Sequence, residues 1–271
     1  MPDVLITGLP RSGLTLVSAL IDSIPGAVSL NSPHVQFVQA LKLRQTIPFC
    51  KWLAGDFVWA RSRLATQNAV NDYRTPDGSH FLDNEKDPGI TLDEKGERKL
   101  SSLIRPGLTG DFLLAMKHDA LYTSVLPTLL EMDHFRVIAV IRNPYDVIRS
   151  WQSFNQNPLS EGKLPFARAY WPEAALIDPD KPIDVLDRMI QIYEMFIQRY
   201  HENRGKVAIL RYEDVIDNPA IVSNLFGIAE APPAASRIVR LPSMRDQEFQ
   251  QKLRDRFRKL GVYTRNYYSE Y

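Results

Sequence analysis

The sequence has little cysteine, little net charge and no long hydrophobic run. Cys50 is the only cysteine among 271 residues, so an intramolecular disulfide bond cannot form and a reducing compartment is expected. The formal net charge of +1 gives no sign of a nucleic-acid or membrane partner. No stretch is apolar enough to span a bilayer, and the first residues lack the pattern of a secretory signal. We therefore expect a cytoplasmic protein in which any anion site is local.

Short apolar segments alternate with helical patterns along the chain. Four segments, 4–7, 112–116, 137–141 and 207–210, are continuously apolar, which is typical of parallel strands covered on both faces. Apolar residues spaced by three and four predict a helix over 14–24 and another from Val185 to Phe196. The pattern predicts a single α/β domain over residues 1–271. Its central parallel sheet is flanked by helices, and its ligand site lies beyond the carboxyl ends of the strands.

Two long segments, 44–110 and 155–183, have a less regular pattern and contain many aromatic residues. Long connections of this kind often form lids or binding loops. We interpret both segments as insertions that shape a pocket for a substrate. Near the end of the chain, a stripe of apolar residues from Phe249 to Leu260 predicts a helix that docks on the core.

The first strand leads into the sequence ITGLPRSGLTLVSALI, residues 6–21, which has the glycines of a phosphate-binding loop. The lysine of a nucleotide triphosphate P-loop is absent, because Leu14 occupies its position, and Arg11 supplies a cation earlier in the loop. Backbone N–H groups at a helix N-terminus, with a forked arginine beside them, form a site suited to phosphate or sulfate. The loop thus predicts a polyanionic ligand other than a triphosphate.

A second cationic turn occurs in VIAVIRNPYDVIRSWQSF, residues 137–154. A buried strand ends at Arg142, Asn143 can cap the next helix, and Pro144 suits its first turn. Ser150 follows Arg142 eight positions later. Two strand–arginine–helix elements in one sheet indicate that the ligand has two separated anionic groups.

These segments resemble the sulfotransferase family. PRSGLTL is similar to its 5′-phosphosulfate loop, VIRNPYDVIRSW to its 3′-phosphate segment, and ILRYEDVIDNP, residues 209–219, to a third family segment. The resemblance implies a P-loop-like sulfotransferase fold and the donor 3′-phosphoadenosine 5′-phosphosulfate (PAPS), with no metal. The donor-binding residues that it implies are Arg11, Ser12, Gly13, Leu14, Thr15, Arg142, Ser150 and Tyr212. Tyr212 could instead pack against the sheet.

The same resemblance implies a catalytic segment in LLAMKHDALYTSVLP, residues 113–127. Lys117 matches the family lysine and is expected to contact the sulfuryl oxygens. His118 follows it directly, whereas cytosolic members interpose one residue before the catalytic histidine. If the extended geometry continues, strand alternation places Lys117 and His118 on opposite faces, with Asp119 on the face of Lys117. If the strand ends at Lys117, His118 can still turn inward. His34, near a position where tyrosylprotein-type members have glutamate, is the second candidate base, since an unperturbed histidine pKa of about 6.5 suits this task.

The sequence therefore predicts a sulfotransferase that acts on a hydroxyl or amine of a small-molecule, glycan or peptide acceptor. Two alternatives use the same motifs. A P-loop kinase or NTPase would need a lysine at position 14 and carboxylates for magnesium. A non-catalytic protein of the same fold would bind the nucleotide without transfer.

Overall fold

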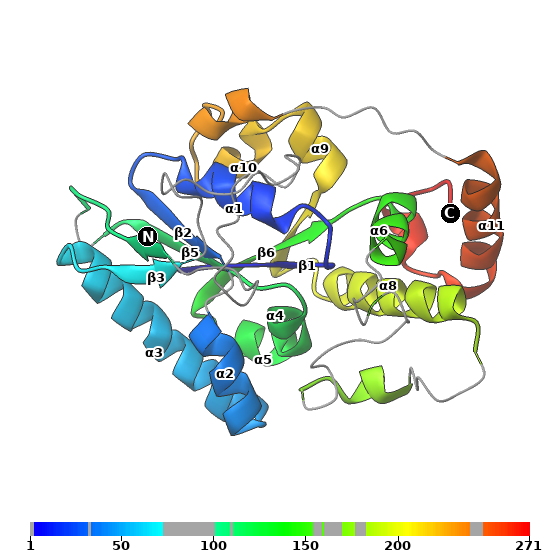
Figure 1. Cartoon of the computed structure of the whole chain (residues 1–271), viewed down its shortest axis with the longest axis horizontal. Coiled ribbons are helices and arrows are strands. Elements are labelled where there is room, and N and C mark those ends of the chain that lie inside the picture. Colours follow the sequence, from blue (N-terminus) through cyan, green and yellow to red (C-terminus); the bar gives the residue numbers. More distant parts are fainter. Residues whose placement is uncertain are drawn as a thin grey trace, which may run out of the picture.

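The chain is built around a parallel sheet of five strands (Figure 1). The computed structural model describes residues 3–31, 34–72, 101–108, 111–153, 159, 170–176, 183–238 and 246–271. The strand order is β2-β5-β1-β6-β7, and every neighbouring pair is parallel. The strands are β1 Asp3–Gly8, β2 Ala27–Asn31, β5 Leu113–Lys117, β6 Phe135–Ile141 and β7 Val207–Arg211. A separate antiparallel pair is formed by β3 Val70–Asp72 and β4 Ser101–Leu103.

Helices cover both faces of the sheet (Figure 1). One face is covered by α1 Leu14–Asp22, α9 Tyr212–Asp217, α10 Ala220–Asn224 and the 3-10 helix η3 Pro233–Arg237. The other face is covered by α2 His34–Leu43, α3 Thr46–Ala65, α4 Ala120–Ser124, α5 Leu126–Glu131, α6 Pro144–Gln152, α8 Val185–Glu202 and α11 Gln247–Leu260. Two further 3-10 helices, η2 Pro172–Leu176 and η4 Thr264–Asn266, complete the described elements.

Two hydrophobic clusters, one on each face, explain why the strands are continuously apolar. In β1, Val4 and Ile6 belong to the cluster under α1, whereas Leu5 belongs to the cluster under α8. In β6, Ile138 and Val140 alternate in the same way with their neighbours. Because successive strand residues point to opposite faces, a strand covered on both sides needs an apolar residue at every position. The prediction of an α/β fold with a central parallel sheet is confirmed.

The four predicted strands are all present within a residue or two of their predicted bounds, but β2 was missed. Its sequence, AVSLN, carries a polar residue at every second position in its second half. Ser29 is nevertheless buried, because its hydroxyl pairs with that of Ser18 on α1 at 2.7 Å. The predicted first helix also ends earlier than expected, at Asp22 rather than Ile24.

Helix α3 occupies twenty residues of the 44–110 segment, which the less regular sequence pattern did not predict. Pro48 and Gly55 obscure the pattern, although a proline in the first turn of a helix is tolerated. Phe49 and Phe57 are fully buried in the core, while Trp59 is exposed. Residues 73–100 and 109–110, and most of 155–183, lie outside the described part of the chain, so the proposed pocket insertions remain predictions. The helices Val185–Glu202 and Gln247–Leu260 confirm the two later helical patterns.

Candidate active site

The loop that joins β1 to α1 lies at the carboxyl edge of the sheet, at its central strand. It closes with a hydrogen bond from the Ser12 N–H to the Leu9 carbonyl (3.1 Å), and the Trp151 indole donates to the Pro10 carbonyl (2.9 Å). Helix α1 begins after Gly13 without a side-chain cap. Its first N–H groups therefore keep the unpaired donors and the positive end of the helix dipole that attract anions.

Both glycines of the loop are required by close approaches. A Cβ on Gly8 would lie 2.3 Å from the Val140 carbonyl oxygen on β6. A Cβ on Gly13 would lie 2.2 Å from the Tyr212 ring, and Gly13 also has a φ of +91°. No side chain fits at either position without displacing its neighbours, so the glycines allow β6 and α9 to pack directly against the loop.

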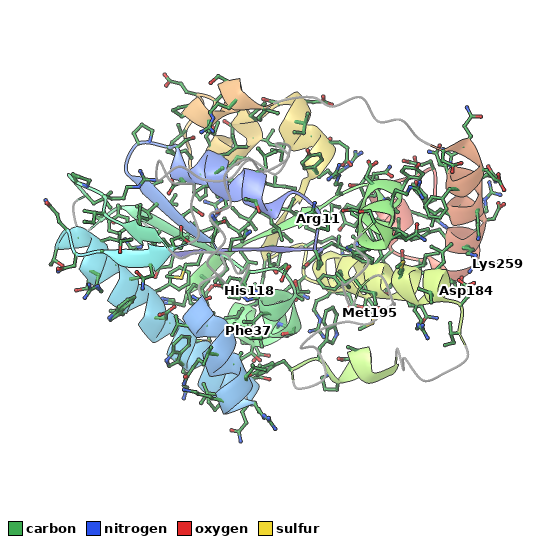
Figure 2. All side chains as sticks on the ribbon, viewed as in Figure 1. Arg11, Phe37, His118, Asp184, Met195 and Lys259 are labelled. Atoms are coloured by element: carbon green, nitrogen blue, oxygen red, sulfur yellow. The ribbon has the colours of Figure 1, made fainter. Side chains whose placement is uncertain are left out.

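Arg11 and Arg142, the two arginines predicted to serve one ligand, lie next to each other. Arg142 Nη1 donates to the Arg11 carbonyl (3.4 Å), and Arg11 Nε donates to the Ser150 hydroxyl on α6 (3.1 Å). Arg11 is exposed and has a φ of +71°, and Figure 2 shows it at the end of β1 on the side facing α6. The fold thus brings together cationic groups from two segments that are 131 positions apart.

Two tyrosines contact Arg142, one through its side chain and one through its backbone. Its guanidinium lies over the Tyr212 ring at 4.3 Å, and its carbonyl accepts from the Tyr193 hydroxyl (2.6 Å). Asn143 caps α6 by accepting from the Tyr145 N–H (3.0 Å), and Pro144 begins the helix, as the sequence predicts. The buried Nε of Arg142 makes no hydrogen bond to the described residues, nor does the buried hydroxyl of Ser12. Both are polar donors suited to an anionic ligand.

Tyr212 is buried between the loop and Arg142, in contact with Gly13 on one side and the guanidinium on the other. These contacts are with the loop and with Arg142, and the predicted contact of Tyr212 with the nucleotide stays a prediction. Leu14 is also buried, in the cluster under α1, so its side chain takes the place of a phosphate-binding lysine without any polar function.

Lys117, at the end of β5, and His118, which follows it, point to opposite faces of the sheet. Lys117 Nζ donates to the Thr15 hydroxyl on α1 (2.9 Å). The His118 N–H continues the ladder by donating to the Ile6 carbonyl (2.9 Å), and the His118 ring packs 5.6 Å from the Tyr122 ring on α4. Figure 2 shows Arg11 and His118 on either side of β1. Lys117 and His118 therefore lie on opposite faces, as strand alternation predicts.

Asp119 directly precedes α4 and caps it, because its carboxylate accepts from the Ala120 N–H (2.7 Å). Its carboxylate lies 3.4 Å from His118 Nδ1. Burial by itself would raise the pKa of Asp119, but the neighbouring His118, the Ala120 N–H and the charge of Lys117 together lower it. Asp119 is therefore a carboxylate near neutral pH, next to the ring of a candidate base.

His34, the other candidate base, is the first residue of α2. The preceding strand, β2, ends at Asn31, which pairs with Lys117 of β5. The backbone therefore places the start of α2 at the same edge of the sheet as Lys117.

Sequence reasoning missed three groups that support the site: Trp151, Tyr193 and Glu213, whose carboxylate accepts from the Asn143 N–H (2.9 Å). Trp151 lies directly after Ser150, and its position next to a candidate donor-binding residue was a signal in the sequence that could have identified it. The Tyr193 hydroxyl reaches Arg142 because of the way α8 is oriented about its axis. The sequence pattern predicts the helix but not which residue its tyrosine contacts. Within the described residues, no cluster of three or more His, Cys, Asp or Glu has metal-binding geometry, and no helix is long and apolar enough to cross a bilayer.

The sequence matches the family model of the sulfotransferase domain over residues 1–224. It matches no protein that has a curated description.

Three solved structures that this chain matches share little sequence with it. One is a sulfotransferase domain from the curacin biosynthetic pathway, with 16% identity, 89% of this chain and 76% of that chain covered, and a TM-score of 0.41. A sulfotransferase from Alicyclobacillus acidocaldarius has 12% identity, 96% and 94% coverage, and a TM-score of 0.43. One from Mycobacterium avium has 16% identity, 95% and 75% coverage, and a TM-score of 0.44.

Proposed function

Because this chain belongs to the sulfotransferase family, we propose that it transfers a sulfuryl group from PAPS to a hydroxyl, or an amine, of an organic acceptor. The observation that carries the proposal is the meeting of Arg11 and Arg142 at the carboxyl edge of the sheet. A nucleotide with a 5′-phosphosulfate and a 3′-phosphate has two anionic ends, and the two turns offer a cation for each.

The 5′ end of the donor would bind to the β1–α1 loop. The N–H groups from Gly13 to Thr15 lie at the start of α1, and Ser12 adds a buried hydroxyl that has no hydrogen bond in the described structure. Hydrogen bonds to an anion satisfy these donors and the helix dipole together. The side chain of Leu14 contributes packing alone, so only its backbone would serve the ligand.

The 3′-phosphate would bind between Arg142 and Ser150. Arg142 keeps its buried Nε without a partner among the described residues. The Ser150 hydroxyl accepts from Arg11 and still has its own proton to donate. An arginine fork and a hydroxyl form a site that suits a phosphate dianion.

Transfer would proceed by in-line displacement at sulfur. The bond from the acceptor oxygen to sulfur forms while the bond from sulfur to the 5′-phosphate oxygen breaks, so negative charge grows on that leaving oxygen. Arg11 and the loop amides are placed to stabilise this charge without reorganising. Lys117, which is hydrogen-bonded to Thr15 at the start of α1, would hold the sulfuryl oxygens.

The proton of the acceptor hydroxyl must pass to a base. His118 and His34 both remain candidates, because both follow strands on the β5–β2 side of the loop. The Asp119 carboxylate lies 3.4 Å from His118 Nδ1, next to the ring of this candidate.

The proposal is tested by donor binding and by transfer. We expect adenosine 3′,5′-bisphosphate to bind in calorimetry, and a screen of sugars, phenols, steroids, lipids and peptides with labelled PAPS to give a sulfated product. Arg142→Ala should weaken binding by about 1.5–3 kcal/mol, roughly 10- to 150-fold, as expected for a lost charged hydrogen bond. Arg11→Ala should abolish transfer while the protein stays folded.

Arg149→Ala is the matched control, because this substitution removes the same charge as Arg142→Ala. Arg149 is exposed on α6 and lies over the Phe249 ring. Equal losses in the two α6-region variants would reject the assigned 3′-phosphate site. Binding without transfer to any acceptor would favour the non-catalytic alternative. Turnover of magnesium–ATP, with no affinity for the bisphosphate, would favour a kinase or NTPase.

A further inference from the structure

The 268–271 segment, Tyr268 to Tyr271, packs against the turn that carries Arg142. Tyr268 and Tyr271 are almost completely buried, at 1% and 3% exposure. This segment lies beyond residue 224, where the match to the family model ends. Figure 1 shows the C-terminus beside α6 and α11.

Glu213 links the segment to the backbone next to Arg142. One carboxylate oxygen accepts from the Asn143 N–H (2.9 Å), and the other accepts from the Tyr268 hydroxyl (2.9 Å). Burial, followed by the charge and hydrogen bond of Glu213, raises the pKa of Tyr268, so this hydroxyl remains a donor. A single carboxylate therefore fixes both the turn and the tyrosine.

The Asn143 side chain forms a second link to the same segment. Its Nδ2 donates to Glu270 Oε1 (3.1 Å), and its Oδ1 accepts from the Tyr271 hydroxyl (3.2 Å) while it caps α6 through Tyr145. The residue directly after Arg142 is thus bound through its backbone and its side chain. Such a doubly held residue leaves little freedom for the preceding guanidinium.

The 268–271 segment is itself held in place by the surrounding helices. The Tyr271 ring meets Phe257 of α11 edge-on at 5.3 Å, and the Arg211 guanidinium covers Tyr268 at 4.8 Å. Just before it, the Glu194 carboxylate of α8 accepts from the N–H groups of Val262 (2.9 Å) and Thr264 (3.1 Å). The segment therefore transmits the rigidity of α8 and α11 to the Arg142 turn.

We propose that Glu213, Tyr268 and Tyr271 are positioning residues that preorganise Arg142 for the 3′-phosphate and so set the selectivity for 3′-phosphorylated nucleotides. This inference rests on the proposed function. A positioning role differs from a purely structural one in its effect on affinity. Substitutions at these residues should weaken the binding of ligands that have a 3′-phosphate and leave the binding of ligands that lack it unchanged.

The test uses Tyr268→Phe and Tyr271→Phe, which remove one hydroxyl each and keep the packed ring. We expect each to weaken adenosine 3′,5′-bisphosphate by roughly threefold to tenfold, as for one lost hydrogen bond. Binding of adenosine 5′-phosphosulfate, which has no 3′-phosphate, should be unchanged. In an Arg142→Ala background the tyrosine variants should cause no further loss.

Tyr267→Phe is the matched control, because its hydroxyl pairs with His201 (3.3 Å) rather than with the Arg142 turn. It should leave both affinities unchanged. Equal losses for the two nucleotides, or losses that persist without Arg142, would overturn the inference. If Tyr268→Phe unfolds, Tyr271→Phe becomes the test. Its hydroxyl donates to Asn143 Oδ1, which would still accept from the Tyr145 N–H after the substitution.

A measurement without nucleotide separates this inference from the proposed function. Hydrogen exchange in a peptide that spans 137–153 should be faster in Tyr268→Phe than in the wild type or in Tyr267→Phe, because Glu213 loses the partner that orients it toward the Asn143 N–H. Unchanged exchange would overturn the inference. Faster exchange in a protein whose wild type fails to bind the bisphosphate would instead reject the proposed function and the selectivity that depends on it.

Discussion

Gly13→Ala is the substitution whose effect the structure defines most closely. The new Cβ would lie 2.2 Å from Cδ2 and 2.6 Å from Cε2 of the Tyr212 ring, which is buried. The same ring supports the Arg142 guanidinium at 4.3 Å. The variant therefore perturbs the β1–α1 loop and the second cationic turn through a single contact.

Two costs add at this position. A left-handed backbone at a φ of +91° costs an alanine about 1–2 kcal/mol, and overpacking against a buried ring costs about 1–3 kcal/mol more. We expect the free energy of unfolding to fall by about 2–5 kcal/mol. Gly26→Ala is the matched control, because Gly26 has a φ of +73° and nothing within 4 Å of its Cβ position. It should lose only the backbone cost, about 1–2 kcal/mol.

Urea unfolding of the two variants, with and without Tyr212→Ala, measures these values. Removing the ring should reduce the cost of Gly13→Ala to that of Gly26→Ala, since only the backbone term remains. If Gly13→Ala costs no more than Gly26→Ala, or if its cost is the same without Tyr212, the close packing of the loop against α9 is refuted.

Two other predictions concern the candidate bases and the single cysteine. His118→Ala and His34→Ala, assayed separately, should identify the base as the variant that loses the acid limb of the pH–rate profile; if neither changes it, the proton passes to another group such as Lys117. Burial raises the pKa of Cys50 to about 12, so a disulfide reagent at pH 8 should label the urea-unfolded chain and leave the native protein unlabelled. In the folded state this thiol keeps its proton above its ordinary pKa of 9.0, so its contribution to stability should fall as the pH rises from there toward 12.

The parts of the site that sequence reasoning predicted are those fixed by local rules. Strand 137–141 needs an apolar residue at each position, and Asn143 and Pro144 mark the helix start, so Arg142 had to stand at the carboxyl edge. The same logic placed Arg11 after β1. Parallel strands bring their carboxyl ends to one edge, and this explains why two distant turns could be assigned to one ligand before their contact was known.

The parts that were missed depend on contacts between distant segments. Glu213 was visible as the middle residue of Tyr-Glu-Asp in the family-like segment 209–219, yet nothing local shows that its carboxylate binds the Asn143 N–H. The hydrogen bond from Tyr268 to Glu213 joins residues 55 positions apart, and no local pattern predicts it. The strand β2 was missed for a related reason, because Ser29 is acceptable in the interior only through its bond to Ser18.

Under the proposed function, the strand order would separate the two ends of the donor and so restrict where a base can lie. Arg142 follows β6, on one side of β1, whereas Lys117 follows β5, on the other side. If the 3′-phosphate lies at Arg142, the sulfuryl group and the acceptor belong on the β5–β2 side.

This geometry selects among the five histidines of the chain. His134 Nε2 lies 3.5 Å from the Asp3 carboxylate, at the opposite edge of the sheet. His201, on α8, pairs with the Tyr267 hydroxyl. His80 lies outside the described residues. Of the histidines that the structure describes, only His118 and His34 follow strands on the required side. An acid limb that disappears with either His134→Ala or His201→Ala would therefore contradict the assigned direction of the donor, and with it the role of Arg142.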